Sequence, residues 1–323
     1  MSNWKLVTVK NSRKSKVMRA YILSISLVFS VTTWAQDDAP KNESDVFIKG
    51  FIAMPSLLMS IDGAQIDLTH FDPNRTWSTG LGITRGDLTL SVSTQTGAPI
   101  DDPALFGETS YFDIQLQHYD RQLGIDGFYQ SYKGYFVRDL PTGCERGEAC
   151  SLRPRLQIEH AGAIAYYVFD PRWSMRAAFS PPGRQNNSAG SWFLTGGFNI
   201  LAVDNDEPLL NGLDPPIEDG RFYMASAALG YGYTWVKGPW FLASAFYLGG
   251  GPMYLEYSAS EENVSENEWE LAIKAGVKIG AGYTGNIWQA GIRVLADSPY
   301  ARPGDTEFNW IAQTVELYAG RQF

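Results

Sequence analysis

The sequence predicts an all-β protein, an antiparallel transmembrane β-barrel of about 12 strands within a range of about 10 to 14. Three observations predict it: long segments with two-residue apolar alternation, aromatic residues at the ends of these segments, and a second face of small and charged residues. All three occur in residues 268–283, which read EWELAIKAGVKIGAGY. Leu271, Ile273, Val277 and Ile279 share one face there, because successive side chains of a strand point to opposite sides.

The chain begins with a targeting segment. Residues 1–19 carry six Lys or Arg and no acid, and the apolar run AYILSISLVFSV follows, then TTWAQ. This pattern is typical of a secretory signal peptide with cleavage after Ala35. The alternative is an N-terminal membrane anchor, for which the apolar run is short. Met18 starts a more ordinary signal, so Met1 and Met18 are both candidate starts. The predicted organisation is a signal peptide at 1–35, a disordered lead at 36–44 and a barrel at 45–323.

The charge of the processed chain excludes one class of partner. Without residues 1–35 the chain has 20 basic and 35 acidic residues, about fifteen net negative charges. This balance argues against nucleic acid. No apolar run after the signal approaches the roughly 20 residues that a membrane helix needs, so any crossing is made by strands.

The two cysteines, Cys144 and Cys150, lie close together in CERGEAC. In an exported protein this spacing predicts a small disulfide-closed loop in an oxidising compartment. The segment has no histidine, and two thiolates do not complete a tetrahedral zinc shell. We therefore expect no metal site and no cofactor.

Alternating segments follow one another from residue 46 to the C-terminus, and some early ones can merge or lie outside the wall. The candidate strands are 46–59, 65–71, 76–84, 88–95, 109–120, 127–137, 155–169, 172–180, 190–203, 221–235, 239–257, 268–283, 287–297 and 308–323. Tight turns are expected at Arg85-Gly86-Asp87, Lys237-Gly238-Pro239 and Thr284-Gly285-Asn286. The expected loops are 96–108, 138–153, 204–220, 258–267 and 298–307, of which the last three lie outside the cell when counted back from a periplasmic Phe323.

Strand length and aromatic placement favour lipid over a soluble sandwich. Residues 268–283 span roughly 50 Å at about 3.3 Å per residue, enough to cross a tilted hydrocarbon layer of about 30 Å. Trp235, Trp240, Trp269, Tyr283 and Trp288 fall at segment ends, where rings suit an interfacial girdle.

Charged residues in these segments must face the interior, because a Lys or Arg at the bilayer midplane costs about 2 to 4 kcal/mol. The side chains predicted to line the lumen by this argument are Asp113, Gln115, Gln117, Arg176, Glu270, Lys274, Lys278, Arg293 and Glu316. Mixed charges of this kind can pair into a closed network or line a pore.

The chain ends on TVELYAGRQF, a strand-like run with a terminal Phe323. Outer-membrane barrels are similar in ending on a strand with a C-terminal Phe, which the barrel assembly machinery reads. Ala319 and Arg321 depart from the usual apolar spacing behind that residue.

Two segments carry a family resemblance: residues 113–136, DIQLQHYDRQLGIDGFYQSYKGYF, and residues 184–198, RQNNSAGSWFLTGGF. They resemble an uncharacterised family, domain of unknown function 4421, whose members are secreted bacterial proteins thought to form outer-membrane β-barrels. The resemblance implies a fold and a place in the bacterial outer membrane. It carries no activity. We expect outer-membrane lipid and lipopolysaccharide as partners.

Three classes of function remain after this reading. The first is a structural or ligand-binding barrel with a polar, ion-paired lumen, and the second is a diffusion or uptake channel. The third is a lipid-modifying enzyme with a Ser and His pair on the wall, for which His118 with Ser110 upstream is the candidate and His160 a weaker one. Neither histidine has the local signature of a nucleophile partner, so we assign no catalytic residue.

Overall fold

The computed structural model describes residues 46–63, 66–140, 143–205, 217–259, 265–302 and 306–323. The chain divides into two units, residues 1–41 and 42–323, and everything below belongs to the second. The predicted signal peptide and lead, residues 1–44, lie outside the described residues.

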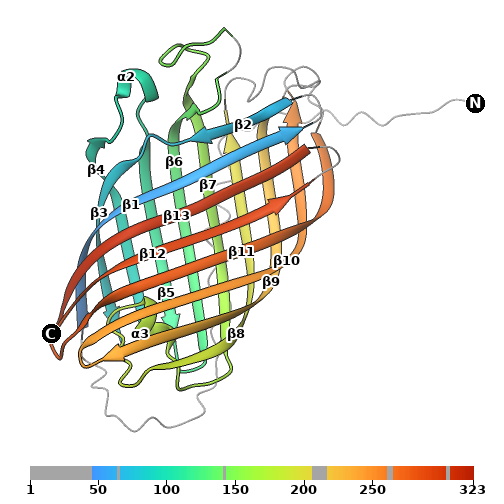
Figure 1. Ribbon diagram of the computed structural model, residues 1–323. Coiled ribbons are helices and arrows are strands. Elements are labelled where there is room, and N and C mark those ends of the chain that lie inside the picture. Colours follow the sequence, from blue (N-terminus) through green and yellow to red (C-terminus); the bar gives the residue numbers. More distant parts are fainter. Residues whose placement is uncertain (1–45, 64–65, 141–142, 206–216, 260–264, 303–305) are drawn as a thin grey trace, which may run out of the picture. The chain divides into compact units, whose positions relative to one another are not determined.

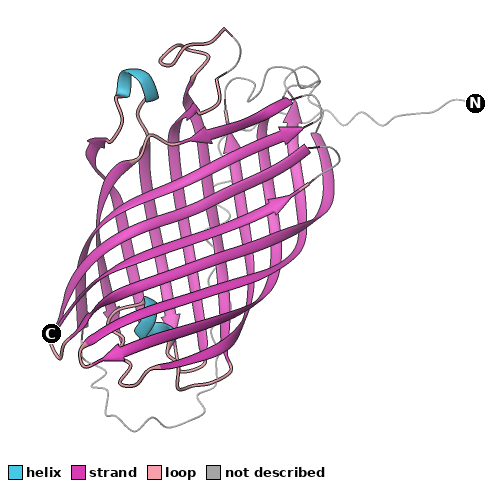
Figure 2. Ribbon diagram, viewed as in Figure 1, coloured by secondary structure: helices cyan, strands magenta, loops and turns pink. Residues whose placement is uncertain are grey.

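The second unit is one antiparallel sheet that closes on itself (Figure 1, Figure 2). Twelve strands form the ring, in the order β1, β3 to β13 and back to β1. Their bounds are β1 (Val46–Gly63), β3 (Thr76–Arg85), β4 (Leu88–Pro99), β5 (Ser110–Tyr119), β6 (Leu123–Val137), β7 (Leu152–Val168), β8 (Ala189–Asp204), β9 (Ile217–Lys237), β10 (Trp240–Ala259), β11 (Ser265–Thr284), β12 (Trp288–Ala301) and β13 (Thr306–Gln322). The predicted all-β barrel of about 12 strands is confirmed.

A thirteenth strand, β2 (Ile66–Asp72), does not complete the ring. It pairs with the far half of β1 through Met59 and Phe71, and with the last two residues of β6. The near half of β1 pairs with β3. The strand expected at 65–71 therefore exists but lies across one end of the wall.

The two ends of the barrel differ in their connections. The turn end carries Val46, Phe323 and the connections that follow β3, β5, β7, β9 and β11. The loop end carries the connections that follow β1, β4, β6, β8, β10 and β12, including the short helix α2 (Pro103–Phe106). The expected loops 204–220, 258–267 and 298–307 are partly wrong, because β9 begins at Ile217, β11 begins at Ser265 and β12 continues to Ala301. These strand ends lie at the loop end. The turn Arg85-Gly86-Asp87 is a hairpin in which Arg85 pairs with Leu88.

The strand expected at 172–180 is wrong. These residues fold back from the β7–β8 connection into the barrel and form the helix α3 (Met175–Phe179), near the turn end (Figure 1). Ser174 caps this helix by accepting a hydrogen bond from the Ala177 amide. Trp173, Met175, Ala177 and Phe179 alternate in sequence like a strand, yet Ala178 between them is buried too. The alternation reflects burial on all sides rather than a wall with two faces.

No helix in the described ranges is long and apolar enough to cross a membrane.

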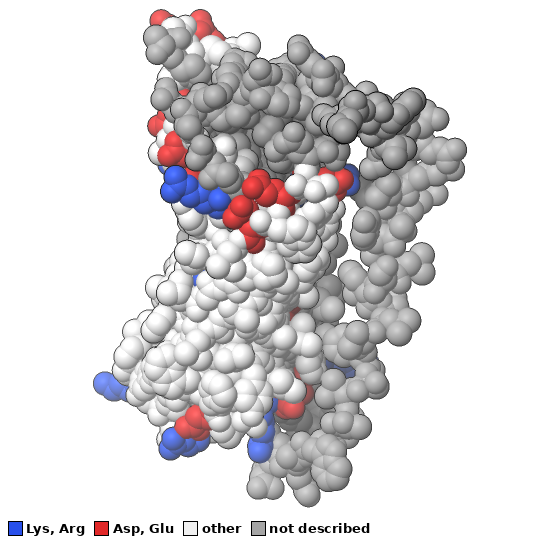
Figure 3. Space-filling model, turned by 90° about the vertical axis from the view of Figure 1, so that its right-hand side faces the viewer, with Lys and Arg blue, Asp and Glu red and all other residues white. Residues whose placement is uncertain are grey.

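The outward side chains of the ring are apolar and the inward ones are buried. In β11, Leu271 is 77% exposed on the outside, whereas Lys274 is 2% exposed on the inside. On the face shown in Figure 3, charged side chains lie toward the two ends and the middle is nearly free of them. Trp240, Trp288 and Phe323 are exposed near the turn end of this wall. The separation of exposed apolar side chains from buried inward ones follows from the two-residue period of a strand.

Candidate functional site: the closed lumen

The lumen contains a polar layer between two apolar clusters. The polar layer is the set of inward charged side chains Lys49, Asp113, Asp126, Lys274, Lys278, Arg293, Asp297 and Glu316. Most of these charged residues share their strand with a residue of a large buried apolar cluster, which lies nearer the loop end. Examples are Glu316 with Trp310 on β13 and Arg293 with Ala301 on β12. The polar layer therefore lies on the turn-end side of that cluster.

Glu316 joins two cations across neighbouring strands. Arg293 lies directly opposite it in the β12–β13 register, and its Nη2 donates to both carboxylate oxygens at 2.6 Å. Lys49 on β1 donates from Nζ to Oε1 of the same carboxylate at 3.2 Å. Both cations are 2% exposed over their side chains. The shared carboxylate therefore gives each of the two buried cations an anionic partner.

A second ion pair joins β11 to β6. Lys278 Nζ lies 2.9 Å from Asp126 Oδ2 and donates to the Tyr166 hydroxyl at 3.0 Å. The other Asp126 oxygen accepts from Tyr119 at 2.5 Å and from Gln117 at 3.2 Å. Because β11 and β6 are not neighbours in the ring, this pair spans the lumen.

A third ion pair lies closer to the loop end, where Lys274 Nζ is 2.9 Å from Asp297 Oδ2. With its amide turned over, Asn199 accepts from the same ammonium at 2.8 Å. Asp113 is buried and accepts from Gln115 at 3.0 Å. Glu270 is half-buried, further toward the loop end of β11.

The structure thus places eight of the nine predicted lumen residues on the inner face of the wall. The ninth, Arg176, belongs to α3 and not to a strand, so its predicted placement by strand parity is wrong. It reaches Asp87 and the Gly86 carbonyl in the β3–β4 turn. Burial lowers the pKa of Arg176, while the neighbouring Asp87 opposes that shift.

The β7–β8 connection, residues 169–188, fills the turn end of the lumen as a plug. Arg293 donates from Nη1 to the Phe179 carbonyl, so the ion-paired arginine of the wall also holds the plug. Ser180 donates to Gln117 at 3.2 Å, and Trp173 Nε1 donates to Thr234 at 3.0 Å. At the start of the connection, hydrogen bonds from Arg172 lower the pKa of Asp170 to about 2. The plug is therefore tied to β5, β9 and β12.

The sequence predicted both members of the Arg293–Glu316 pair but only one member of each of the other three buried ion pairs. Lys49, Asp126 and Asp297 were not among the predicted residues. Asp297 had a usable signal, since it shares strand parity with Arg293 in β12. Lys49 had none, because both faces of residues 46–59 are apolar, and Asp126 falls just before the strand start expected at 127.

The expectation of a polar lumen holds only for the middle layer. Toward the loop end, the interior is packed with apolar and aromatic side chains, including Met59, Tyr132, Phe222, Met253 and Trp310. Toward the turn end, plug residues pack with wall residues in a second cluster, in which Trp173 stacks on Phe193 at 5.7 Å. The inner face of the wall is thus packed like the core of a soluble domain at both ends.

The candidate Ser and His pair is not formed. Ser110 and His118 lie at opposite ends of β5, roughly 26 Å apart at about 3.3 Å per residue, and His118 points outward with Leu116. His160 is buried inside the lumen against Phe128 and Trp310, and neither ring nitrogen has a hydrogen-bond partner among the described residues. The structure brings neither histidine to a nucleophile.

The loop end is held together on its β4–β7 side. Cys144 and Cys150 form the expected disulfide, so neither is available as a metal-binding thiolate. Arg146 between them lies 5.3 Å from the ring centroids of both Phe106 in α2 and Phe136 in β6. The disulfide loop is thereby packed on the neighbouring connection.

This geometry defines a class: a twelve-stranded antiparallel β-barrel with an apolar outside, an ion-paired interior and an inward-folded plug. The family model described as Domain of unknown function (DUF4421) matches residues 39–323, and the chain belongs to that family.

Three solved structures similar to this chain are distant from it in sequence. The outer membrane protease OmpT from Escherichia coli is 6% identical over 87% of this chain and 98% of that chain, with a TM-score of 0.42. Ail, the attachment invasion locus protein of Yersinia pestis, is 12% identical over 85% and 98%, with a TM-score of 0.27. The Pseudomonas putida toluene transporter TodX is 7% identical over 86% and 89%, with a TM-score of 0.30. No curated protein matches the chain, and no activity is transferred from these likenesses.

Proposed function

We propose that the protein is an outer-membrane β-barrel with a closed interior, which acts as a structural or surface-binding element of the bacterial envelope. The observation that carries this proposal is the double role of Arg293, which compensates Glu316 and holds the plug carbonyl of Phe179. A plug tied to the wall by a buried charge is suited to a permanently closed lumen.

The charge balance of the polar layer supports closure. The layer has four cations and four acids, and three of the acids are ion-paired with the four cations. A selectivity filter usually exposes a ring of one charge sign to the permeating solute. Charges that compensate one another inside apolar clusters offer no such ring.

The outer wall supports the membrane location. Exposed Leu, Ile, Val and Phe side chains lie on adjacent strands of the outer face, and contiguous exposed apolar surface is typical of membrane or protein contact. Exposed aromatic residues lie near the turn end of this surface, where an interfacial girdle is expected. The Cys144–Cys150 disulfide fits an oxidising compartment outside the cytoplasm.

Conductance across a planar lipid bilayer tests closure against the channel alternative. We expect a flat current at all voltages, recorded with protein whose heat-modifiable gel migration demonstrates a folded barrel. Reproducible unitary current steps from the same preparation would refute the closed lumen. Recovery of the processed chain as a detergent-free soluble species would refute the membrane location.

We also propose that the C-terminal strand is the signal for assembly and that lipopolysaccharide surrounds the wall. Phe323 is exposed and pairs with Val46 through two backbone hydrogen bonds of 2.8 and 3.3 Å, so it closes the seam between β13 and β1. Crosslinking of the nascent chain to the assembly machinery tests this role. We expect Phe323→Ala to weaken crosslinking, whereas Phe169→Ala, which removes another exposed ring at the same end, leaves it unchanged.

A further inference from the structure

The turn end of the barrel is basic, although the chain as a whole is acidic. Among the described residues, the turn-end connections and the strand ends beside them carry seven Lys or Arg and three Asp or Glu, whereas residues 36–323 together carry 20 and 35. The cations are Arg85, Arg121, Arg172, Arg176, Arg184, Lys237 and Arg321, and the acids are Asp87, Asp120 and Asp170. These ten residues and residues 184–188 are called the turn-end face below.

The acids of the turn-end face do not balance its cations. Two of the three acids lie in ion pairs, Asp87 with Arg176 and Asp170 with Arg172. The third, Asp120, accepts a hydrogen bond from the backbone amide of its neighbour at 2.7 Å. The other five cations are exposed. The face therefore presents an excess of positive charge to a partner, and such a field attracts anions.

The last part of the plug, residues 184–188 with the sequence RQNNS, runs from α3 inside the ring to β8 in the wall. Gln185 holds this segment in place. Its Oε1 accepts from the Ser174 amide at 2.9 Å, and its Nε2 donates to the Asn187 carbonyl at 2.8 Å. The exposed side chains of this segment are therefore carried by a fixed backbone.

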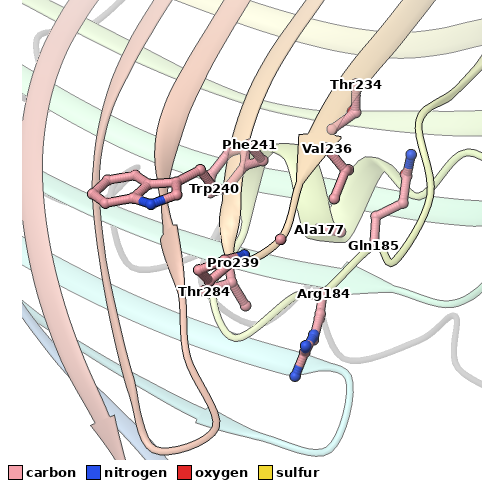
Figure 4. Close-up of a pocket in the computed structure, with 10 residues that line it drawn as sticks. Ala177, Arg184, Gln185, Thr234, Val236, Pro239, Trp240, Phe241 and Thr284 are labelled. Atoms are coloured by element: carbon pink, nitrogen blue, oxygen red, sulfur yellow. The ribbon is translucent and has the colours of Figure 1, made fainter.

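Arg184 is directed away from the strands (Figure 4), and its Nη1 donates to the Asn286 side-chain oxygen in the β11–β12 turn at 3.0 Å. This hydrogen bond positions the guanidinium, whose planar fork matches the two oxygens of a carboxylate. The gap between the plug and the β9–β10 hairpin in the same view has room for about one water molecule. A larger partner therefore binds on the surface of residues 184–188 and not beneath them.

The position of the plug decides from which side a partner reaches this face. Lipid headgroups border the outer wall, whereas the plug lies inside the ring of strands, so its surface faces the aqueous compartment beside the membrane. In outer-membrane barrels the short turns face the periplasm. A partner of the turn-end face thus approaches along the barrel axis from the periplasm.

The side chains of the face indicate the chemistry of that partner. Guanidinium groups bind carboxylates, and the amides and hydroxyl of residues 186–188 can donate to and accept from sugar hydroxyls and peptide groups. Residues 184–188 and the turns 85–87 and 120–122 contain no aromatic, Leu, Ile, Val or Met side chain. Protein interfaces depend on such anchors. The face is therefore better suited to a hydrated, anionic polymer than to an acidic protein.

We propose that the turn-end face binds peptidoglycan, through the free carboxylates of its short peptides. Arg184 and Lys237 pair with carboxylates, while the amides of residues 186 and 187 contact the sugar and peptide groups beside them. Binding of this kind links the barrel to the polymer below the outer membrane. The inference rests on the proposed membrane location and adds a partner class to it.

Co-sedimentation with purified peptidoglycan sacculi tests this inference. The processed chain is folded in detergent micelles, its heat-modifiable migration is checked, and the bound fraction is measured over a range of sacculus concentrations. The double variant Arg184→Gln with Lys237→Gln should raise the dissociation constant about tenfold, the sum expected for two exposed charge contacts. Binding should also be lost in about 1 M salt, where the Debye length is about 3 Å.

A matched variant and a modified polymer make the outcome decisive. Lys133→Gln with Arg221→Gln removes two exposed cations near the loop end and should leave binding unchanged. An equal loss in both double variants would overturn the turn-end face in favour of attraction by overall charge. Sacculi whose carboxylates are amidated should not bind, and retained binding would overturn carboxylate recognition.

Failure of this inference and failure of the proposed function give different results. A heat-modifiable, folded barrel that does not sediment with sacculi would refute the peptidoglycan site alone and leave an acidic protein as the partner of the face. A processed chain that stays dissolved without detergent would refute the membrane location.

Discussion

Arg293 and Glu316 stand directly opposite each other on β12 and β13, and one guanidinium nitrogen reaches both carboxylate oxygens at 2.6 Å. The same guanidinium reaches the Phe179 carbonyl of the plug, and Glu316 also accepts from Lys49. The Glu316 carboxylate therefore joins three strands, and Arg293 links this ion-paired group to the plug.

Neutralising Glu316 is expected to destabilise the barrel strongly. Glu316→Gln leaves Lys49 and Arg293 buried without a compensating charge, which costs about 3 to 5 kcal/mol of unfolding free energy. Urea unfolding in vesicles, followed by tryptophan fluorescence, measures this loss. Glu307→Gln is the matched control, because its pair with Arg302 is partly exposed and is worth at most about 1 kcal/mol. Equal losses in the two variants would contradict a buried network.

A cation on the outer wall is expected to impair insertion. Ile279 is 43% exposed on the outer face of β11, so Ile279→Lys places a charge in hydrocarbon at a cost of about 2 to 4 kcal/mol. Folding yield in vesicles, read by heat-modifiable migration, checks the prediction. Ile100→Lys makes the same change at the loop end. A comparable drop in folding yield there would argue against the placement of Ile279 in the hydrocarbon layer.

Enlarging Gly232 is expected to displace the plug. A Cβ at this position would lie 2.1 Å from the Trp173 ring, so Gly232→Leu cannot keep that ring in place. A water-soluble maleimide should then label Ala178→Cys in the double variant but not in the single one. Gly196→Leu on neighbouring β8 is the control, since a Cβ there meets nothing within 4 Å. Labelling in the control would mean that the plug opens without the clash.

Removal of the disulfide is expected to loosen the loop end without opening the wall. The double variant Cys144→Ala with Cys150→Ala should lose about 2 kcal/mol, the value for a short closed loop. Trypsin should cut after Arg146 at least about tenfold faster, while heat-modifiable migration stays unchanged. Dithiothreitol on the wild type should reproduce the result, and unchanged cleavage in both cases would show that the Phe106 and Phe136 contacts alone hold the loop.

The wall was predictable because one physical rule governs it. Alternation over long segments located the twelve ring strands with errors of a few residues at their ends, as at β9, which starts before residue 221. The rule fails where a segment is buried on every side. At 172–180 it read a helix inside the barrel as another strand.

The site was predictable only in part, since alternation reports a face and not a partner. It placed Lys278 inward but could not pair it with Asp126, which lies 152 residues away in sequence on a strand that is not a neighbour. It also could not foresee that aromatic and apolar side chains fill the loop-end half, because both faces of β1 are apolar there. An ion pair across the lumen depends on the diameter of the barrel and the tilt of its strands, and the two-residue period of the sequence predicts neither.

The pairing of β1 with β13 determines when the barrel can close. These strands come from opposite ends of the described chain, so their pairing is the most distant contact in the sheet and must wait for the last segment to be delivered. Until then the wall is an open ribbon with two unsatisfied edges, vulnerable to pairing with other chains. Closure of the barrel therefore requires that these two edges stay unpaired with other chains until the last strand is delivered.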